Sequence, residues 1–125
     1  MYQQVSVETR LTDASPHQLV AMLFDGYMEA VAQARGAMRD RQHGAKGVAI
    51  GRAVRIVEEG LRAGLDLNAG GALARDLNDL YNYLSMRLTL ANLHNDEAAL
   101  DECQRLMEPL CQAWASIAAT TLATR

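Results

Sequence analysis

Residues Leu73–Leu93, LARDLNDLYNYLSMRLTLANL, decide the fold, because they predict one long helix with two apolar faces. An α-helix turns by about 100° per residue, so residues three or four positions apart share a face. The first face consists of Leu73, Leu77, Leu80, Leu84, Leu88 and Ala91. The second face, more than about 100° away, consists of Tyr83, Met86, Leu90 and Leu93. We expect the first face to pack in a core, and the second to meet a neighbouring helix, an N-terminal arm or an outside partner.

The composition agrees with a helical protein. The chain has 125 residues, which is the length of one ordinary domain. Hydrophobic residues make up 50% of the chain but aromatic residues only 5%, so the core has to be built from aliphatic side chains and Met. Such a composition favours helices over sheets. The predicted class is therefore all-α.

Three further amphipathic segments complete the predicted architecture. Ser15-Pro16-His17-Gln18 has the order of a helix start, with Ser as N-cap, Pro in the first position and Gln returning a hydrogen bond. Asn68-Ala69-Gly70-Gly71 is a helix stop, and Asn95-Asp96-Glu97 supplies the next cap. The prediction is a single domain over 1–125, an antiparallel four-helix bundle with an N-terminal arm over 1–14 and helices over about 15–41, 46–67, 72–94 and 96–122.

The helix predicted over 46–67 also has two faces. Its core face consists of Ile50, Val54, Val57, Leu61 and Leu65. Its second face consists mostly of small residues: Ala49, Ala53, Ile56, Gly60, Ala63 and Leu67. A Gly inside a helix costs about 1 kcal/mol relative to Ala, so a close approach of another backbone should account for the small residues. That neighbour is either another helix of the bundle or a partner in a shallow groove.

The last helix carries a regular apolar seam. The seam consists of Leu100, Cys103, Met107, Leu110, Trp114, Ile117 and Thr121. Pro109 removes the hydrogen bond to the carbonyl of Arg105 and predicts a bend. Cys103 and Cys111 lie about 12 Å apart along a helix, too far for a disulfide, and are expected to be free thiols.

Several classes of function are disfavoured by the sequence. The net charge of −3 and the absence of a basic stripe argue against nucleic acid. No apolar run is long enough to span a membrane and no signal sequence follows Met1, which predicts a cytoplasmic protein without membrane insertion. His17, His43 and His94 are far apart in the sequence, so we predict neither a metal site nor a cofactor, and no enzyme activity.

One short motif suggests an alternative. His43-Gly44-Ala45-Lys46-Gly47 resembles the H-x-x-K-G core of histidine phosphotransfer domains, which are also four-helix bundles. In that family the His lies midway along an exposed helix. Here Gly44 and Gly47 crowd a predicted helix start, so this context favours a different function.

Two longer motifs are more specific. SPHQLVAMLFDG (Ser15–Gly26) and GGALARDLNDLYNYLSMRLTLAN (Gly70–Asn92) resemble the first-helix and third-helix signatures of the flagellar secretion chaperone FliS family. Tyr2 near the N-terminus and Trp114 in the last helix also match, and the resemblance covers nearly the whole chain. It implies a cytosolic bacterial four-helix chaperone that binds the disordered C-terminal segment of flagellin, blocks premature polymerisation and assists delivery to the type III export apparatus. Export-gate components are a second partner class that it suggests.

The resemblance and the apolar faces together predict site residues. We expect the client groove to be formed by Ile56, Gly60 and Ala63 with Tyr83, Met86, Leu90 and Leu93, and an arm containing Tyr2 and Val5 to cover it. Motif residues expected to hold the bundle together, mainly through buried polar bonds, are Asp25, Gly26, Asn78, Tyr81 and Asn92. A homodimer that uses the second faces is a further alternative, and exchange of the arm predicts either a monomer or a dimer.

Overall fold

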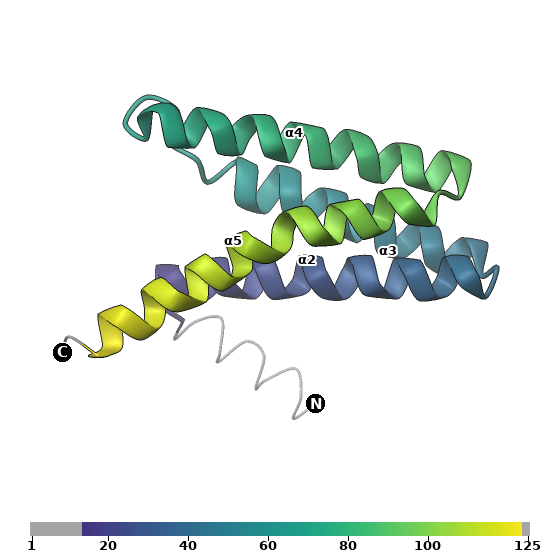
Figure 1. Ribbon diagram of the computed structural model, residues 1–125, viewed down its shortest axis with the longest axis horizontal. Helices are drawn as coiled ribbons and strands as arrows, with labels where there is room; N and C mark the ends of the chain where they lie inside the picture. Colours follow the sequence, from purple (N-terminus) through teal and green to yellow (C-terminus); the bar gives the residue numbers. More distant parts are fainter. Residues whose placement is uncertain (1–13, 124–125) are drawn as a thin grey trace.

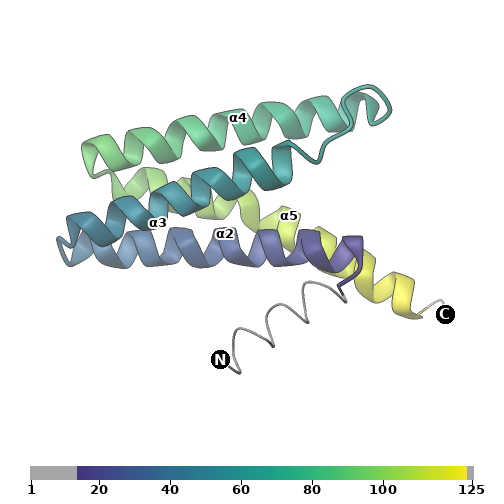
Figure 2. The ribbon, with the colours of Figure 1, turned by 180° about the vertical axis from the view of Figure 1, so that it is seen from behind.

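The computed structural model describes residues 14–123, with side chains described for 14–117. The helices are α2 (Pro16–Arg39), α3 (His43–Arg55), η1 (Ile56–Arg62), α4 (Gly71–His94) and α5 (Glu97–Ala123). The π-helix η1 continues α3 directly, so these elements form four rods arranged as a bundle (Figures 1 and 2). The predicted all-α class is confirmed for the described residues. Tyr2 and Val5 of the predicted arm lie outside them.

The predicted caps set two of the helix starts. The Ser15 side chain accepts a hydrogen bond from the Gln18 N–H at 3.1 Å, and the Gln18 side chain accepts one from the Ser15 N–H at 2.8 Å. The Asp96 side chain accepts a hydrogen bond from the Ala99 N–H at 3.2 Å at the start of α5. Both starts therefore satisfy backbone donors that a helix N-terminus leaves free.

The helix predicted over 46–67 differs at both ends. It starts at His43, because Arg41 adopts a left-handed conformation (φ 56°) and completes the turn from α2 within three residues. It ends at Arg62, five residues before the predicted end. Asp66 Oδ1 then accepts hydrogen bonds from the N–H groups of Asn68 and Ala69, which stabilises a turn rather than a helix. The prediction that residues 68–71 terminate this helix was wrong; they lead into α4.

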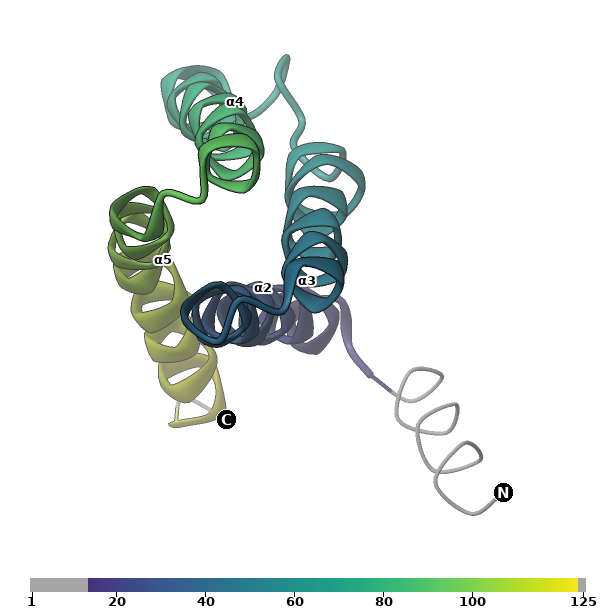
Figure 3. The same cartoon turned by 90° about the vertical axis from the view of Figure 1, so that its right-hand side faces the viewer.

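The core lies along the middle of the bundle. Figure 3 views the molecule from the end where α2 meets α3 and where α4 meets α5, and the rods surround a common centre. The Tyr27 hydroxyl, fully buried, donates a hydrogen bond to the Cys103 carbonyl at 3.0 Å and thereby links α2 to α5. The largest fully buried side chains are Tyr27, Leu84, Leu88, Leu100, Met107, Val31, Val57 and Cys103.

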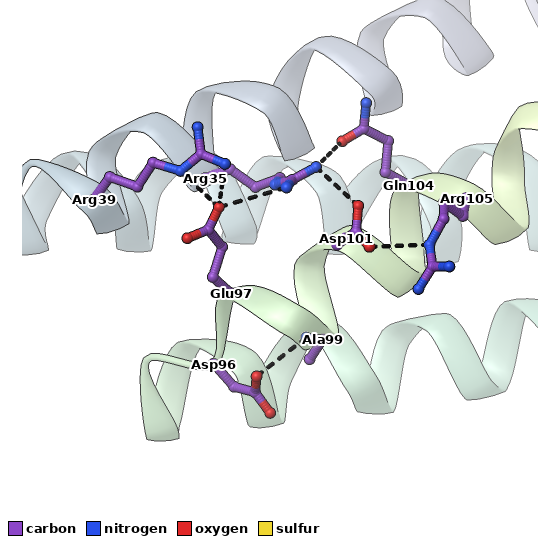
Figure 4. Close-up of polar contacts among 8 residues, drawn as sticks. All are labelled: Arg35, Arg39, Asp96, Glu97, Ala99, Asp101, Gln104 and Arg105. Carbon is purple, nitrogen blue, oxygen red and sulfur yellow. Dashed lines mark hydrogen bonds and ion pairs between the residues drawn. The ribbon is translucent and has the colours of Figure 1, made fainter.

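Polar side chains join the helices at this end. Arg35 and Arg39 of α2 pair with Glu97 of α5, and Arg35 also donates to Asp101 at 3.2 Å and to Gln104 at 2.8 Å (Figure 4). We call this end the closed end. At the other end α5 diverges from α4, so the two helices are well separated there (Figure 1). We call it the open end.

Pro109 does not terminate α5, which continues to Ala123. The predicted seam of α5 is only partly buried. Leu100, Cys103 and Met107 are fully buried, whereas Ile117 is 53% exposed. The seam therefore runs out of the core toward the open end.

Candidate functional site: an apolar cavity at the open end

Four rods contribute apolar side chains to a cavity at the open end. The cavity has a volume of about 340 Å³. Its walls are Val20, Leu23 and Phe24 of α2; Gly60, Leu61, Gly64 and Leu65 of η1 and the turn after it; Leu73, Leu77 and Tyr81 of α4; and Leu110, Ala113, Trp114 and Ile117 of α5. We call it the apolar cavity. Its rim remains open, because Leu73 is 69% exposed and Ile117 53% exposed.

The cavity exists because the helices that build it differ in length and direction. The helix α3–η1 ends at Arg62, while α4 begins at Gly71, and Leu73 in the first turn of α4 is left exposed. At this end α5 diverges from α4 (Figure 1), and Ile117 of α5 is exposed. Apolar side chains that would be core in a longer bundle therefore face an empty volume.

An aromatic contact fixes one wall. The rings of His17 and Trp114 stack with centroids 4.4 Å apart, and Trp114 Nε1 donates a hydrogen bond to the His17 carbonyl at 3.0 Å. Phe24 contacts the same indole with ring centroids 6.2 Å apart. These contacts tie the first turns of α2 to the second half of α5, so Trp114 presents a fixed apolar surface to the cavity.

Two buried titratable groups of the bundle, Tyr81 and Cys103, have raised pKa values. Burial raises the pKa of Tyr81 above its ordinary value, so its ring lines the wall as an uncharged group. Burial also raises the pKa of the Cys103 thiol to about 12, which leaves it protonated and unsuited to nucleophilic chemistry. Both cysteines are free. The apolar walls are suited to holding apolar side chains.

A second cavity of about 440 Å³ lies between α2 and α3. It is lined by Gln33, Ala45, Val48, Ala49 and Arg52, including a charged and an amide side chain. Only two helices form it. The apolar cavity is the better candidate, because more elements converge on it and its walls are apolar.

The small face of the second helix packs mainly within the bundle. A Cβ at Gly60 would lie 3.0 Å from a methyl of Leu23, and a Cβ at Gly26 would lie 3.3 Å from Ile56. Close packing against α2 therefore accounts for Ile56 and Gly60, one of the two alternatives that the sequence left open. Gly60 also lines the apolar cavity, whereas Ala63 is exposed after the end of η1.

The second face of α4 is exposed in the described residues. Met86 is 51% and Leu93 71% exposed, and Leu90 is also exposed. The Tyr83 hydroxyl donates a hydrogen bond to Glu102 of α5 at 2.8 Å. Because Tyr83 faces α5 while Gly60 faces α2, the structure does not bring the two predicted sets into one groove.

The motif residues take different positions. Tyr81 is buried, and Asn78 Oδ1 accepts a hydrogen bond from Arg62 Nε at 2.9 Å. The Asn92 carbonyl accepts one from the Lys46 ammonium at 3.0 Å. Asp25 is exposed, so the buried polar bond expected for it was wrong.

Half of the cavity residues lie on faces that the sequence predicts as core. Leu73 and Leu77 belong to the first apolar face of α4, and Leu110, Trp114 and Ile117 belong to the seam of α5. Periodicity identifies such a face but does not show where its partner helix stops. The sequence pattern does not show that η1 ends at Arg62, and this early end leaves the cavity open.

The histidine phosphotransfer alternative gains no support from the geometry. His43 is the first residue of α3 rather than a mid-helix residue. Lys46, which should be accessible near it, is 6% exposed and bonded to Asn92 and Asn95. Within residues 14–123, no group of three or more His, Cys, Asp or Glu residues could hold a metal ion. None of the described helices is both long and apolar enough to cross a membrane.

Comparison with known proteins identifies the family. The family model described as "Flagellar protein FliS" matches residues 1–121. The flagellar secretion chaperone FliS of Salmonella typhimurium is 45% identical over 116 residues, covering 93% of this chain and 86% of that protein. FliSB of Pseudomonas aeruginosa is 46% identical over 116 residues, covering 93% of this chain and 91% of the relative. FliS of Escherichia coli is 42% identical over 113 residues, covering 90% and 83%. The chain therefore belongs to the FliS family of flagellar proteins.

Proposed function

We propose that this chain is a flagellar secretion chaperone that binds the disordered C-terminal segment of flagellin in the apolar cavity. It prevents premature polymerisation and assists delivery to the flagellar type III export apparatus. The apolar cavity is the observation that carries the proposal, and the family membership supplies the identity of the client. This role requires binding of the client and no catalysis. We propose that the protein performs it in the bacterial cytosol.

The size of the cavity agrees with a peptide client. An engineered cavity of about 150 Å³ is large enough to bind benzene, so about 340 Å³ accommodates roughly two large apolar side chains. Most of the described walls are helices, whose backbone groups are already bonded within the helices. A bound client segment must therefore satisfy its own backbone, which favours entry as an amphipathic helix.

The exposed rim provides further contact area. A disordered client loses conformational entropy when it folds on its partner, so it needs a long apolar contact to compensate. Leu73 and Ile117 extend the apolar walls outward from the cavity. Met86, Leu90 and Leu93 on the outer face of α4 stay a predicted second contact for the same segment.

Two matched variants on α4 test which surface binds the client. Leu73 and Leu93 are 69% and 71% exposed and lie near opposite ends of the same helix. In calorimetric titration with a C-terminal flagellin segment, Leu73→Asp should lower affinity by about tenfold or more, because it places a charge at the cavity rim. Leu93→Asp should lower the affinity by less than Leu73→Asp does.

Circular dichroism of each variant serves as the folding control. The mixture with wild-type chain should gain helix as the client folds. A larger loss of affinity for Leu93→Asp than for Leu73→Asp would show that the client binds the outer face of α4. Absence of binding by the wild-type chain would reject the flagellin proposal. Light scattering of the free and loaded chain distinguishes a monomer from an arm-exchanged dimer.

Delivery brings the loaded chaperone to components of the export gate, which are the second partner class of the proposal. The same two variants, loaded with client, can be tested for binding to purified export-gate cytoplasmic domains.

A further inference from the structure

His17 and Trp114 join the first turn of α2 to the wall that α5 contributes to the apolar cavity. Their rings are nearly parallel, with an interplanar angle of 6° and centroids 4.4 Å apart. Trp114 Nε1 also donates a hydrogen bond to the His17 carbonyl at 3.0 Å. One residue of α2 therefore holds the indole in two ways, and of these only the stack depends on the His17 side chain.

The N-terminus of α2 provides a fixed base for the His17 ring. The side chains of Ser15 and Gln18 accept hydrogen bonds from each other's backbone N–H groups, and Pro16 restricts the backbone between them. His17 lies inside this turn. The backbone that carries its ring is therefore held by local contacts, which do not depend on the position of α5.

The second half of α5 has a weaker hold on the bundle. Pro109 has no N–H, so it donates no hydrogen bond to the Arg105 carbonyl in the preceding turn of the helix. The buried residues of α5 all lie before Pro109: Ala99, Leu100, Cys103 and Met107. Among the side chains described for residues 108–117, none is buried. The contacts of Trp114 are therefore important for the position of this half.

Hydrogen bonding by Nε2 does not explain why a histidine stands at position 17. This atom is buried and has no hydrogen-bond partner within the residues that the structure describes. A buried nitrogen without a partner costs stability. The flat face of the ring, which covers the indole, accounts for the residue better than this nitrogen does.

We propose that His17 is a positioning residue for client binding: its ring, stacked on Trp114, holds the second half of α5 in place as a wall of the apolar cavity. This inference rests on the proposed chaperone function. Without the stack, the client has to order this wall as it binds, and the cost of that ordering lowers its affinity.

Three substitutions separate the ring from its nitrogen. His17→Ala removes the stack and should lower the affinity for a C-terminal flagellin segment by about threefold to tenfold, the range that an aromatic pair contributes. His17→Phe keeps a flat ring and should bind within about twofold of wild type. His43→Ala is the matched control, because His43 is exposed in the first turn of α3, and it should leave the affinity unchanged. Calorimetric titration measures all four proteins.

Trp114 provides a measurement that needs no client. It is the only tryptophan of the chain, so acrylamide quenching reports the exposure of this indole alone. Quenching in the free protein should increase in His17→Ala and stay close to wild type in His17→Phe and His43→Ala. Circular dichroism and urea unfolding show which variants are folded. If His17→Ala does not fold, His17→Leu, which keeps an apolar side chain without a ring, replaces it.

Equal flagellin affinity of His17→Ala and wild type would overturn the inference while leaving the proposed function intact. A loss in His17→Phe as large as that in His17→Ala would overturn it too, as would quenching in His17→Ala that matches wild type. If the wild-type chain binds no flagellin segment, the proposed function fails. Acrylamide quenching then decides the positioning role alone: greater exposure of Trp114 in His17→Ala than in His17→Phe supports it, and equal exposure rejects it.

Discussion

At the scale of single residues, Lys46 shows how a polar side chain can stabilise this fold from inside. It is the only lysine of the sequence, and it is buried at the start of α3. Its ammonium donates to the Asn92 carbonyl and to the Asn95 side chain, near the C-terminus of α4. A cation is favourable there, because the last carbonyls of a helix carry partial negative charge. The lysine of the H-x-x-K-G motif therefore has a structural role in this fold.

Lys46→Met should destabilise the bundle. It removes two hydrogen bonds and leaves acceptors unpaired inside the connection, which should lower the free energy of unfolding by about 1 to 3 kcal/mol. Arg55→Met, on the same helix but exposed, is the matched control and should change it by less than about 0.5 kcal/mol. Urea unfolding measures both, and equal effects would assign Lys46 no special role.

At the scale of elements, ion pairs hold α2 to α5 at the closed end. The hydrogen bond from Arg39, together with Arg35, holds the pKa of Glu97 below its ordinary value of 4.5 (Figure 4). Hydrogen bonds from Arg87 and Tyr83 lower the pKa of Glu102, which joins α4 to α5. These carboxylates stabilise the folded state only while they are ionised.

Acid should therefore weaken the closed end. The stabilisation by Glu97 is complete above pH 4.5 and is lost as the pH falls from there through its lowered pKa, because the unfolded state takes up a proton in this range more readily than the folded state does. The urea concentration at which half of the protein is unfolded should decrease once the pH is lowered below 4.5. This decrease should be less steep for the Glu97→Gln variant. Parallel pH profiles for the two proteins would show that this ion pair does not contribute.

The elements also show how far sequence reasoning could reach. Ser15, Gln18 and Asp96 determine helix starts through local hydrogen bonds, so α2 and α5 begin where the sequence indicates. At its end, η1 contacts α4 through the hydrogen bond from Arg62 to Asn78, a long-range contact that no local pattern contains. Regular 3.6-residue periodicity therefore places Ala63 on the small face, whereas the helix has already ended at Arg62 and Gly64, in the turn that follows, lines the cavity.

The candidate site was only partly predictable for the same reason. Gly60 was expected at the groove and lines the cavity. Leu73 and Ile117 were expected in the core, because their spacing matches the inward faces of α4 and α5. Their exposure follows from where a neighbouring helix ends and how α5 diverges. Those are properties of the assembled bundle.

At the scale of the whole molecule, the two ends of the bundle have opposite character. Ion pairs and hydrogen bonds join α2, α4 and α5 at the closed end. Aliphatic and aromatic side chains line the open end, where the helices diverge (Figures 1 and 2). The closed end provides the rigidity, so the open end can keep apolar surface available for a client.

The central claim is that the client occupies the apolar cavity at the open end. Trp114 is the only tryptophan of the chain and lines this cavity, so its fluorescence reports occupancy directly. Titration with a tryptophan-free C-terminal flagellin segment should shift its emission to shorter wavelength and reduce quenching by acrylamide. Both changes should saturate at the affinity found by calorimetry. Saturable heat of binding with unchanged Trp114 emission and quenching would show that the client binds elsewhere and would contradict the account.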